Sequence, residues 1–429
     1  MKVLMFGWEF PPHISGGLGT ASYGLTRGMY TIGGIDILFV VPKAYGDEDQ
    51  NIARVIGAGD VIVKQHLYTF SKLNKQMNYF QVESKVVPYV DPEDFWKLKK
   101  KEVSADRWYV QTDEQGKIKF SGKYGADLLE EIRKYALVAS VIARENEFDV
   151  IHAHDWLAYP AGIAAKAVSG KPLVIHVHAT DFDRSRGNVN PEVYAIEKQG
   201  MDVADKIIAV SNLTRNIIIE KYRIPQEKVI TVHNAVDPVT TDQRNFEKGQ
   251  LGDKIVTFLG RITMQKGPEY FVEAASRVLQ RMDQVRFVMA GSGDMMQKMI
   301  ALAAAKGIMN RFHFTGFLKG DEVYRMLHLS DVYVMPSVSE PFGISPLEAL
   351  QSSVPVIISH QSGVAEILTH ALKINFWDID AMSDSIYALL NYPALTKMFT
   401  KYGKEEVNRL KWENAAQKVR EIYLSLVSN

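Results

Sequence analysis

Short runs of Val, Ile and Leu alternate along the chain with longer stretches in which apolar residues recur at helical spacing. Helical stretches in the first half include residues 20–32, 127–145 and 158–167. Val- and Ile-rich strands that alternate with helices are typical of a parallel sheet covered on both faces. The strands predicted for this half lie at 3–6, 37–41, 150–152, 173–178, 206–210 and 229–232.

The same alternation restarts in the second half, after a polar and aperiodic stretch at 238–254 that resembles a linker. In open α/β sheets, ligands bind beyond the carboxyl ends of the strands. Two such domains would therefore direct their loops into a shared cleft. The strands predicted for the second half lie at 255–259, 285–290, 311–315, 332–335 and 354–358.

Residues 60–125 interrupt the alternation. The runs at 61–68 and 77–87 are predicted strands that could pair antiparallel, and 91–101 is charged and aromatic. We interpret the region as an insertion in the first domain. Its lysines could meet an anionic partner or could belong to a solvated helix face. These lysines are Lys97, Lys99, Lys100 and Lys101.

Length and composition limit the functional classes. At roughly 150 residues per domain, 429 residues predict two or three domains. Fifty basic and fifty acidic residues leave no net charge, so neither nucleic acid nor anionic lipid is an expected partner. Without cysteine, the chain has no disulfides, thiolate metal sites or cysteine nucleophile. Residues 1–7 read as a buried strand rather than a signal peptide, and no segment approaches the roughly 18 apolar residues of a membrane span, so we expect a cytoplasmic protein.

Two loops carry features that suit phosphate. Gly16 and Gly17 follow the first strand and precede a helix, where glycine permits close backbone approach and the helix start favours an anion. An ordinary tight turn is the alternative. Arg261 and Lys266 lie in the loop after the first strand of the second domain. Two cations at this place suit a diphosphate and could neutralise its charge as it leaves.

A third loop, at 336–349, combines carboxylates with a predicted helix start. Pro346 suits a first helical turn, so the helix should begin near 344–345 and offer free N–H groups to a second anion. Glu340, in the loop beside this site, would accept hydrogen bonds from hydroxyl groups, as a sugar supplies. Glu348, inside the helix, could do the same or could be a surface residue.

Histidines gather at two neighbouring strand ends. His152 and His154, with Asp155, end the strand that begins at Val150, and His176 and His178 end the next strand. An H-x-H pattern along a strand points both rings to one face without supplying further ligands, so we expect no metal site here. Contact between one histidine and the substrate is the preferred interpretation.

Taken in this order, the motifs resemble those of retaining nucleotide-sugar glycosyltransferases with the GT-B fold, and most closely the glycogen/starch synthase-like group within the glycosyl transferases group 1. The resemblance covers nearly the whole chain, and its strongest element is the E-x7-E motif from Glu340 to Glu348. The other matching motifs are Pro11-Pro12 with Gly16-Gly17-Leu18, His154-Asp155-Trp156, Ala209-Val210-Ser211, Asn234-Ala235-Val236-Asp237, and Gly260-Arg261 with Lys266-Gly267.

The resemblance implies an α/β architecture with two Rossmann-like, doubly wound parallel-sheet domains that face a cleft. Residues 1–237 would form an N-terminal acceptor-side domain, with the insertion at about 60–125. Residues 238–395 would form the nucleotide-sugar-binding domain, and the helices at 396–429 would cross back to the first domain.

The resemblance also implies residue roles. Arg261 and Lys266 would bind the donor diphosphate, Glu340 the donor-sugar hydroxyls and Glu348 the ribose hydroxyls. His178 would lie against the transferred sugar near its anomeric carbon. Glu340 could be argued as a nucleophile, as in retaining glycosidases, but its place against sugar hydroxyls favours binding. The other implied contacts are Gly16, Gly17, Phe342, Gly343, Ile344 and Ser345 with the donor, and Asp155 and Trp156 on the acceptor side.

These implied roles need no metal or other cofactor, because the cations and the helix start would take the leaving-group charge. Two stretches depart from the family pattern. The late loop has His360-Gln361-Ser362-Gly363-Val364 where the family usually has a Gly-Gly pair, and the first loop departs as well. Many bacterial glycogen synthases have Lys-Thr before Gly-Gly-Leu, whereas this chain has Ile14-Ser15. The departure weakens a transfer of ADP-glucose specificity and leaves UDP-sugars open.

The expected function is that of a retaining glucosyltransferase of glycogen biosynthesis, which extends an α-1,4-glucan from ADP-glucose or UDP-glucose. The donor and the glucan are then its partners. One alternative keeps the chemistry and changes the acceptor to a surface polysaccharide, a lipid-linked sugar or a small sugar. Two others are a nucleotide-sugar epimerase on the same fold and an inactive sugar-binding scaffold.

Overall fold

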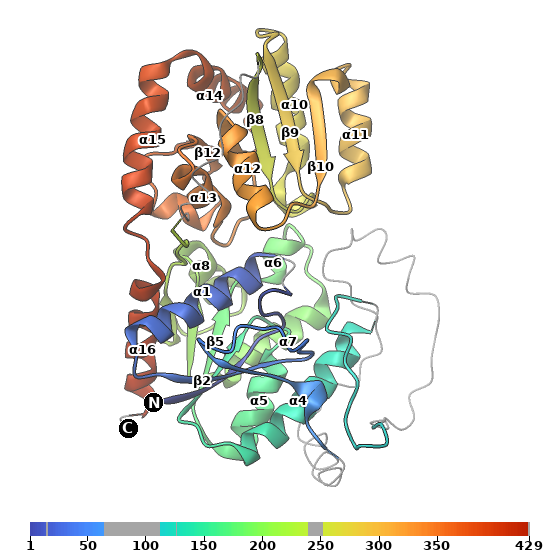
Figure 1. The fold of residues 1–429 in the computed structure, drawn as a ribbon, viewed down its shortest axis with the longest axis vertical. Helices are drawn as coiled ribbons and strands as arrows, with labels where there is room; N and C mark the ends of the chain where they lie inside the picture. Colours follow the sequence, from blue (N-terminus) through green and yellow to red (C-terminus); the bar gives the residue numbers. More distant parts are fainter. Residues whose placement is uncertain (14–15, 64–111, 126, 239–251, 428–429) are drawn as a thin grey trace.

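The computed structural model describes residues 1–13, 16–63, 112–125, 127–238 and 252–427. Their strands form two separate parallel sheets, one in each of two domains stacked along the long axis (Figure 1). This is the α/β organisation with two doubly wound domains that the sequence predicts. The first sheet, in the order β3-β2-β1-β4-β5-β6-β7, contains β1 (Lys2–Phe6), β2 (Asp36–Val41), β3 (Arg54–Gly57), β4 (Val150–His154), β5 (Leu173–Val177), β6 (Lys206–Ala209) and β7 (Val229–Thr231). The second, in the order β10-β9-β8-β11-β12-β13, contains β8 (Lys254–Leu259), β9 (Val285–Ala290), β10 (Phe312–Gly316), β11 (Val332–Met335), β12 (Val356–Ser359) and β13 (Leu372–Ile374).

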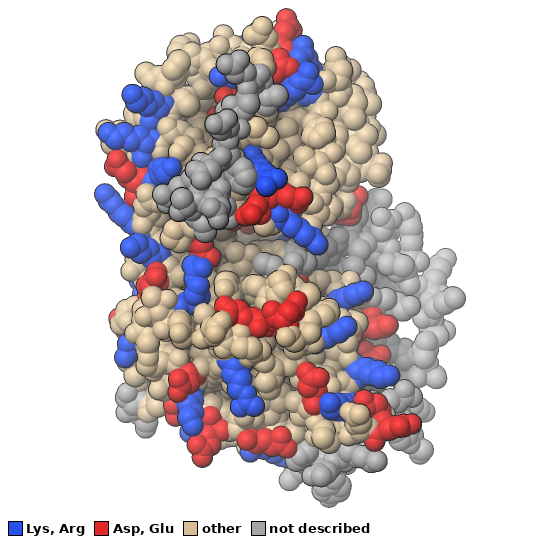
Figure 2. Space-filling view, viewed as in Figure 1, with Lys and Arg blue, Asp and Glu red and all other residues tan. Residues whose placement is uncertain are grey.

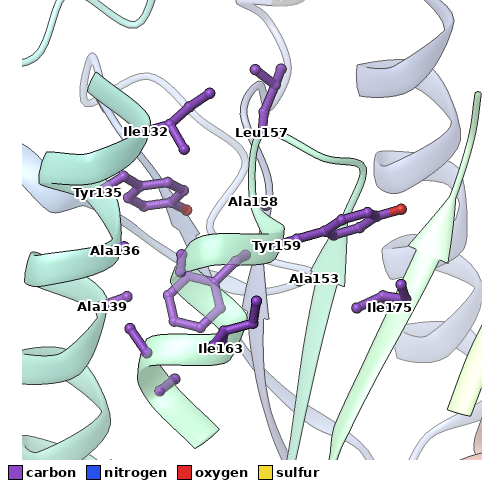
Figure 3. Close-up of a cluster of buried hydrophobic side chains, with 14 of the residues drawn as sticks. Ile132, Tyr135, Ala136, Ala139, Ala153, Leu157, Ala158, Tyr159, Ile163 and Ile175 are labelled. Atoms are coloured by element: carbon purple, nitrogen blue, oxygen red, sulfur yellow. The ribbon is translucent and has the colours of Figure 1, made fainter. Parts of the chain in front are cut away.

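Helices cover both faces of the first sheet because its strands are apolar on both sides. On one face, Ile132 and Tyr135 of α4 (Leu128–Glu145) pack with Tyr159 and Ile163 of α5 (Tyr159–Ser169) over β4 and β5 (Figure 3). The buried Tyr135 hydroxyl donates to the carbonyl oxygen of Gly7 at 3.0 Å, so its polar end is satisfied. The same domain contains α6 (Asp181–Arg184), α7 (Pro191–Val203) and α8 (Asn212–Lys221).

The last helix of the chain crosses from the second domain to the other face of the first sheet. There α16 (Trp412–Val427) packs against α1 (Gly17–Ile32), and the two lie side by side in Figure 1. A Cβ atom on Gly24 would lie 2.2 Å from the Trp412 indole, so α1 needs glycine at this contact. The C-terminal segment is thus part of the first domain's core.

In the second domain, helices likewise pack against the sheet. On the surface, Figure 2 shows acidic and basic side chains interspersed over the visible face of both domains. No helix in the described parts of the chain is long and apolar enough to cross a membrane. The helices of this domain are α10 (Pro268–Leu279), α11 (Met296–Ala305), α12 (Asp321–Leu329), α13 (Ser345–Gln351), α14 (Ile379–Asn391) and α15 (Pro393–Val407).

The predicted strands at 285–290 and 332–335 have the bounds of β9 and β11. The strand predicted at 150–152 continues to His154, while β3 and β13 were not predicted. Both are short edge strands, and a polar residue in each, Arg54 and Lys373, breaks an already short apolar run. Most of the predicted antiparallel pair lies outside the described residues, and its first three residues, 61–63, form no named strand. The lysine cluster of the insertion, Ile14-Ser15 and most of the linker also lie outside the described residues.

Candidate active site

A cleft of about 560 Å³ lies where the carboxyl ends of the two sheets face each other, as the sequence predicts. It is lined by Gly16, Gly17, Asp155 and His178 from the first domain and by Arg261, Lys266, Glu340, Phe342, Gly343, Ile344, Ser345 and Glu348 from the second. Residues from separate strand ends therefore meet in one cavity large enough for a nucleotide sugar.

The start of α1 forms one wall of the cleft. Gly16 is the residue before its first turn, in extended backbone conformation. A Cβ atom at Gly16 or Gly17 would meet nothing within 4 Å, so protein packing does not require glycine at either position. The two glycines instead leave the N–H groups of the helix start open to the cleft, an arrangement that suits an anion.

The loop after β8 brings a cation to the opposite wall. A short 3₁₀ turn at Met264–Lys266 ends at Gly267, where φ is +62° and an added Cβ would lie 2.3 Å from the Pro336 carbonyl oxygen. Only glycine fits there. The turn points Lys266 toward Glu340, and the two side chains form an ion pair.

This ion pair was not predicted, because the sequence analysis gave the two residues separate ligands. The Lys266 and Glu340 side chains are 20% and 8% exposed, so the pair is largely shielded from water. The Ser337 hydroxyl donates to the same Glu340 oxygen at 3.1 Å. The Glu340 backbone is fixed as well, since its N–H donates to the Gln361 carbonyl at 2.8 Å.

Helix α13 begins at Ser345, as predicted, with Pro346 in its first turn. The Ser345 hydroxyl lies 2.8 Å from the Tyr333 hydroxyl, which holds the helix start against β11. Glu348 lies in the same turn and lines the cleft. Burial raises the pKa of Glu348 to about 7, and the negative charge of Asp237 adds to the shift.

His178 enters the cleft one residue past β5. The Asp155 carboxylate accepts from the backbone N–H of His178 at 3.1 Å and of Ala179 at 3.4 Å, which fixes this turn. Burial lowers the pKa of His178 to about 3, so its imidazole is neutral near neutral pH. Burial also raises the pKa of Asp155 to about 6, against the opposing charge of Arg184.

Trp156 does not lie in the cleft. Asp155 has φ +61°, and the chain turns so that Trp156 is 2% exposed within the core of the first sheet. The sequence analysis expected Trp156 to contact the acceptor, and this buried position does not agree with that expectation. Its ring instead lies under the Arg184 guanidinium, 6.0 Å from ring centroid to Cζ.

The sequence analysis missed two groups of cleft residues. Arg184 lines the first-domain side, and its Nη2 donates to Glu197 at 2.6 Å. The loop from Phe317 to Gly320 lines the second-domain side. This loop follows β10, so the rule that located the other loops would also have found it.

Contacts between the domains border the cleft. Arg186 of the first domain bonds Glu269 at 2.7 Å and the Met264 carbonyl at 2.9 Å. Elsewhere, the Glu366 carboxylate of the second domain accepts from the N–H groups of Asn212 and Leu213 at 2.9 and 2.7 Å. The two domains are therefore held together by specific polar contacts.

Two protein-family models match adjoining parts of the chain. Residues 119–239 match Glycosyltransferase Family 4, and residues 239–406 match Glycosyl transferases group 1. With the two facing parallel sheets, these matches define a nucleotide-sugar glycosyltransferase of the GT-B type.

Full-length relatives agree with this class. The chain is 26% identical to an uncharacterised glycosyltransferase of Methanocaldococcus jannaschii, over 99% of this chain and 98% of the relative. It is 22% identical to a glycogen synthase of Mycobacterium tuberculosis, over 99% and 95%. A solved structure of Anabaena HepE in complex with UDP and glucose has a similar fold, with a TM-score of 0.67 at 15% identity over 99% of this chain and 100% of that chain.

Proposed function

We propose that this chain is a retaining glucosyltransferase that extends an α-1,4-glucan from ADP-glucose or UDP-glucose, with glycogen biosynthesis as its setting. The observation that carries the proposal is the meeting of Lys266, Glu340 and His178 in one cleft, opposite the open start of α1. The full-length similarity to a glycogen synthase supports the glucan acceptor, and the HepE complex with UDP and glucose supports a UDP-sugar as one candidate donor.

The diphosphate of the donor would lie between the start of α1 and the loop that carries Arg261 and Lys266. Charge develops on the distal phosphate as the bond from the anomeric carbon to the phosphate oxygen breaks. With the donor bound, the two cations and the N–H groups of the helix start would face this charge, which would lower the barrier. The same groups hold the sugar in the orientation needed for transfer.

Donor binding would rearrange the ion pair between Lys266 and Glu340. The diphosphate offers Lys266 a second anion, while the sugar hydroxyls offer Glu340 neutral donors. Glu348 would accept hydrogen bonds from the ribose hydroxyls. Both carboxylates then contribute to selecting a nucleotide sugar over a simple diphosphate.

Retention of configuration follows from attack on the same face that the phosphate leaves. The acceptor hydroxyl forms the new bond to the anomeric carbon, and its proton passes to the departing phosphate oxygen. In this scheme no side chain forms a covalent intermediate. His178 is neutral, so it would contact the sugar as a hydrogen-bonding group and not as a cation.

A panel of donors tests the proposal. Protein without added metal is incubated with ADP-glucose, UDP-glucose, GDP-mannose or UDP-N-acetylglucosamine, with and without glycogen, and released nucleoside diphosphate is measured. Release from a glucose donor that rises with glycogen, and that falls at least about 100-fold in Lys266→Ala, is expected. NMR of the product then reports whether the new linkage is α.

Release from another donor, or release that ignores glycogen, would contradict the glucan assignment and point to a lipid-linked, surface-polysaccharide or small-sugar acceptor. Conversion of the donor to another nucleotide sugar would indicate an epimerase. Folded protein that releases nothing from any of these donors would favour a sugar-binding scaffold.

A further inference from the structure

Four histidines lie side by side on the face of the first sheet that α16 covers. β4 carries His152 and His154, β5 carries His176, and His178 follows it. The parallel register pairs His154 with His176. The ring centroids of His152 and His154 are 4.3 Å apart, and those of His154 and His176 are 5.3 Å apart. The residues His152, His154 and His176 are at most 2% exposed.

The ring nitrogens of these three residues are only partly used. Nδ1 of His152 bonds the Tyr423 hydroxyl of α16, and Nδ1 of His154 lies 3.0 Å from Nε2 of His178. Within the described part of the chain, Nε2 of both residues and both nitrogens of His176 have no hydrogen-bond partner. A buried polar group without a hydrogen-bond partner is costly and rare in folded proteins, so this cluster needs an explanation.

We propose that His152, His154 and His176 bind one divalent transition-metal ion, with Zn²⁺ as the best match. One ring nitrogen from each residue lies within 4.8 Å of the other two. Three imidazoles are a recurrent zinc donor set, and tetrahedral bonds of about 2.05 Å would bring the nitrogens to about 3.3 Å from one another. On binding, the stacked rings would rotate about their side-chain bonds to make this closer approach.

The existing hydrogen bonds fit that role. Histidines that bind a metal through one nitrogen usually hydrogen-bond through the other, which fixes the ring and its tautomer. His152 and His154 both use Nδ1 in this way and leave Nε2 for the ion. The sequence analysis expected no metal because an H-x-H strand supplies only two rings, but the register of β5 brings a third.

The ion would lie behind the cleft and not within it, because His178 lines the cleft and the three ligands do not. With the ion on Nε2 of His154, the proton of that ring is on Nδ1 and is donated to Nε2 of His178. His178 then carries its own proton on Nδ1. The metal site is thus a positioning element for His178, independent of which donor or acceptor the protein uses.

Equilibrium dialysis of tag-free, full-length protein against Zn²⁺, followed by metal analysis, tests the site. Wild type is expected to hold about one ion per chain, and the matched control His313→Ala, which changes an exposed histidine, should hold the same. His176→Leu removes a ligand whose ring makes no hydrogen bond within the described residues, and the metal content of the variant should fall at least about tenfold. Co²⁺ in place of Zn²⁺ should give the visible spectrum of a tetrahedral site.

Wild type that holds no ion, or His176→Leu that holds as much as His313→Ala, would overturn the proposal. Circular dichroism and the melting temperature show whether His176→Leu folds. If it does not, Tyr423→Phe decides, because it keeps all three ligands and removes the hydrogen bond to His152. Its affinity for Zn²⁺ should fall about 10- to 100-fold at unchanged stoichiometry, and an unchanged affinity would contradict the assignment.

Discussion

The ion pair between Lys266 and Glu340 should stabilise the fold as well as prepare the donor site. Variants of the two residues measure its contribution to stability separately from activity. Lys266→Met leaves Glu340 with the Ser337 hydroxyl as its remaining side-chain partner in the described structure. Glu340→Gln leaves Lys266 charged without that carboxylate. The double variant removes both charges. Each single variant should lower the free energy of unfolding, and the double variant should lower it by less than the sum of the two single effects.

The exposure of the two side chains sets the magnitude of the coupling free energy between them. Exposed pairs contribute about 0–1 kcal/mol, whereas breaking a buried pair costs about 3–5 kcal/mol. Lys266 is one-fifth exposed at 20% and Glu340 is 8% exposed, which places this pair between those limits. We expect a coupling free energy of about 1–2 kcal/mol. For a domain of this size that corresponds to about 2–8 °C in melting temperature.

Thermal melts of wild type, both single variants and the double variant measure the coupling. The matched control is the pair Arg277 and Asp380 in the same domain, whose side chains are 47% and 74% exposed. Its coupling should be below about 0.5 kcal/mol. Losses that simply add at Lys266 and Glu340, or a coupling no larger than that of the control pair, would refute the reasoning.

Two further predictions concern the walls of the cleft. Because burial raises the pKa of Glu348 from an ordinary 4.5 to about 7, its carboxylate form accumulates in the folded protein only as the pH approaches and passes 7. The free energy of unfolding falls between about pH 4.5 and 7, where unfolding releases the proton of Glu348, and levels off above that range. Calorimetric affinity for a nucleoside diphosphate should therefore contain a component that grows with pH and disappears in Glu348→Gln; identical pH profiles would contradict it. Gly267→Ala should cost about 1–2 kcal/mol for the left-handed backbone alone, and more for the 2.3 Å approach to Pro336. Its melting temperature and its activity should both fall, because Lys266 is in the displaced turn, whereas Gly252→Ala, with open space around it, should match wild type in both.

Much of the fold could be predicted because buried β-branched runs mark central parallel strands, as at β9 and β11. The loops at the strand ends then located most of the cleft. The pairing of Lys266 with Glu340 could not be predicted, since the two are 74 residues apart in loops that only the β8–β11 pairing brings together. The direction of Trp156 depends on the backbone angle at Asp155, and the histidine cluster depends on the register of β4 against β5. No periodicity along the chain contains that information.

The central claim is that this cleft binds a nucleoside diphosphate through the loop after β8. Isothermal titration of UDP and ADP into wild type, Lys266→Ala and Lys397→Ala tests it most directly, because Lys397 is an exposed lysine that does not line the cleft. One nucleotide should bind per chain, with unchanged affinity in Lys397→Ala and an affinity at least about tenfold weaker in Lys266→Ala. Equal affinity in the two variants, or no binding of either nucleotide to wild type, would contradict the account.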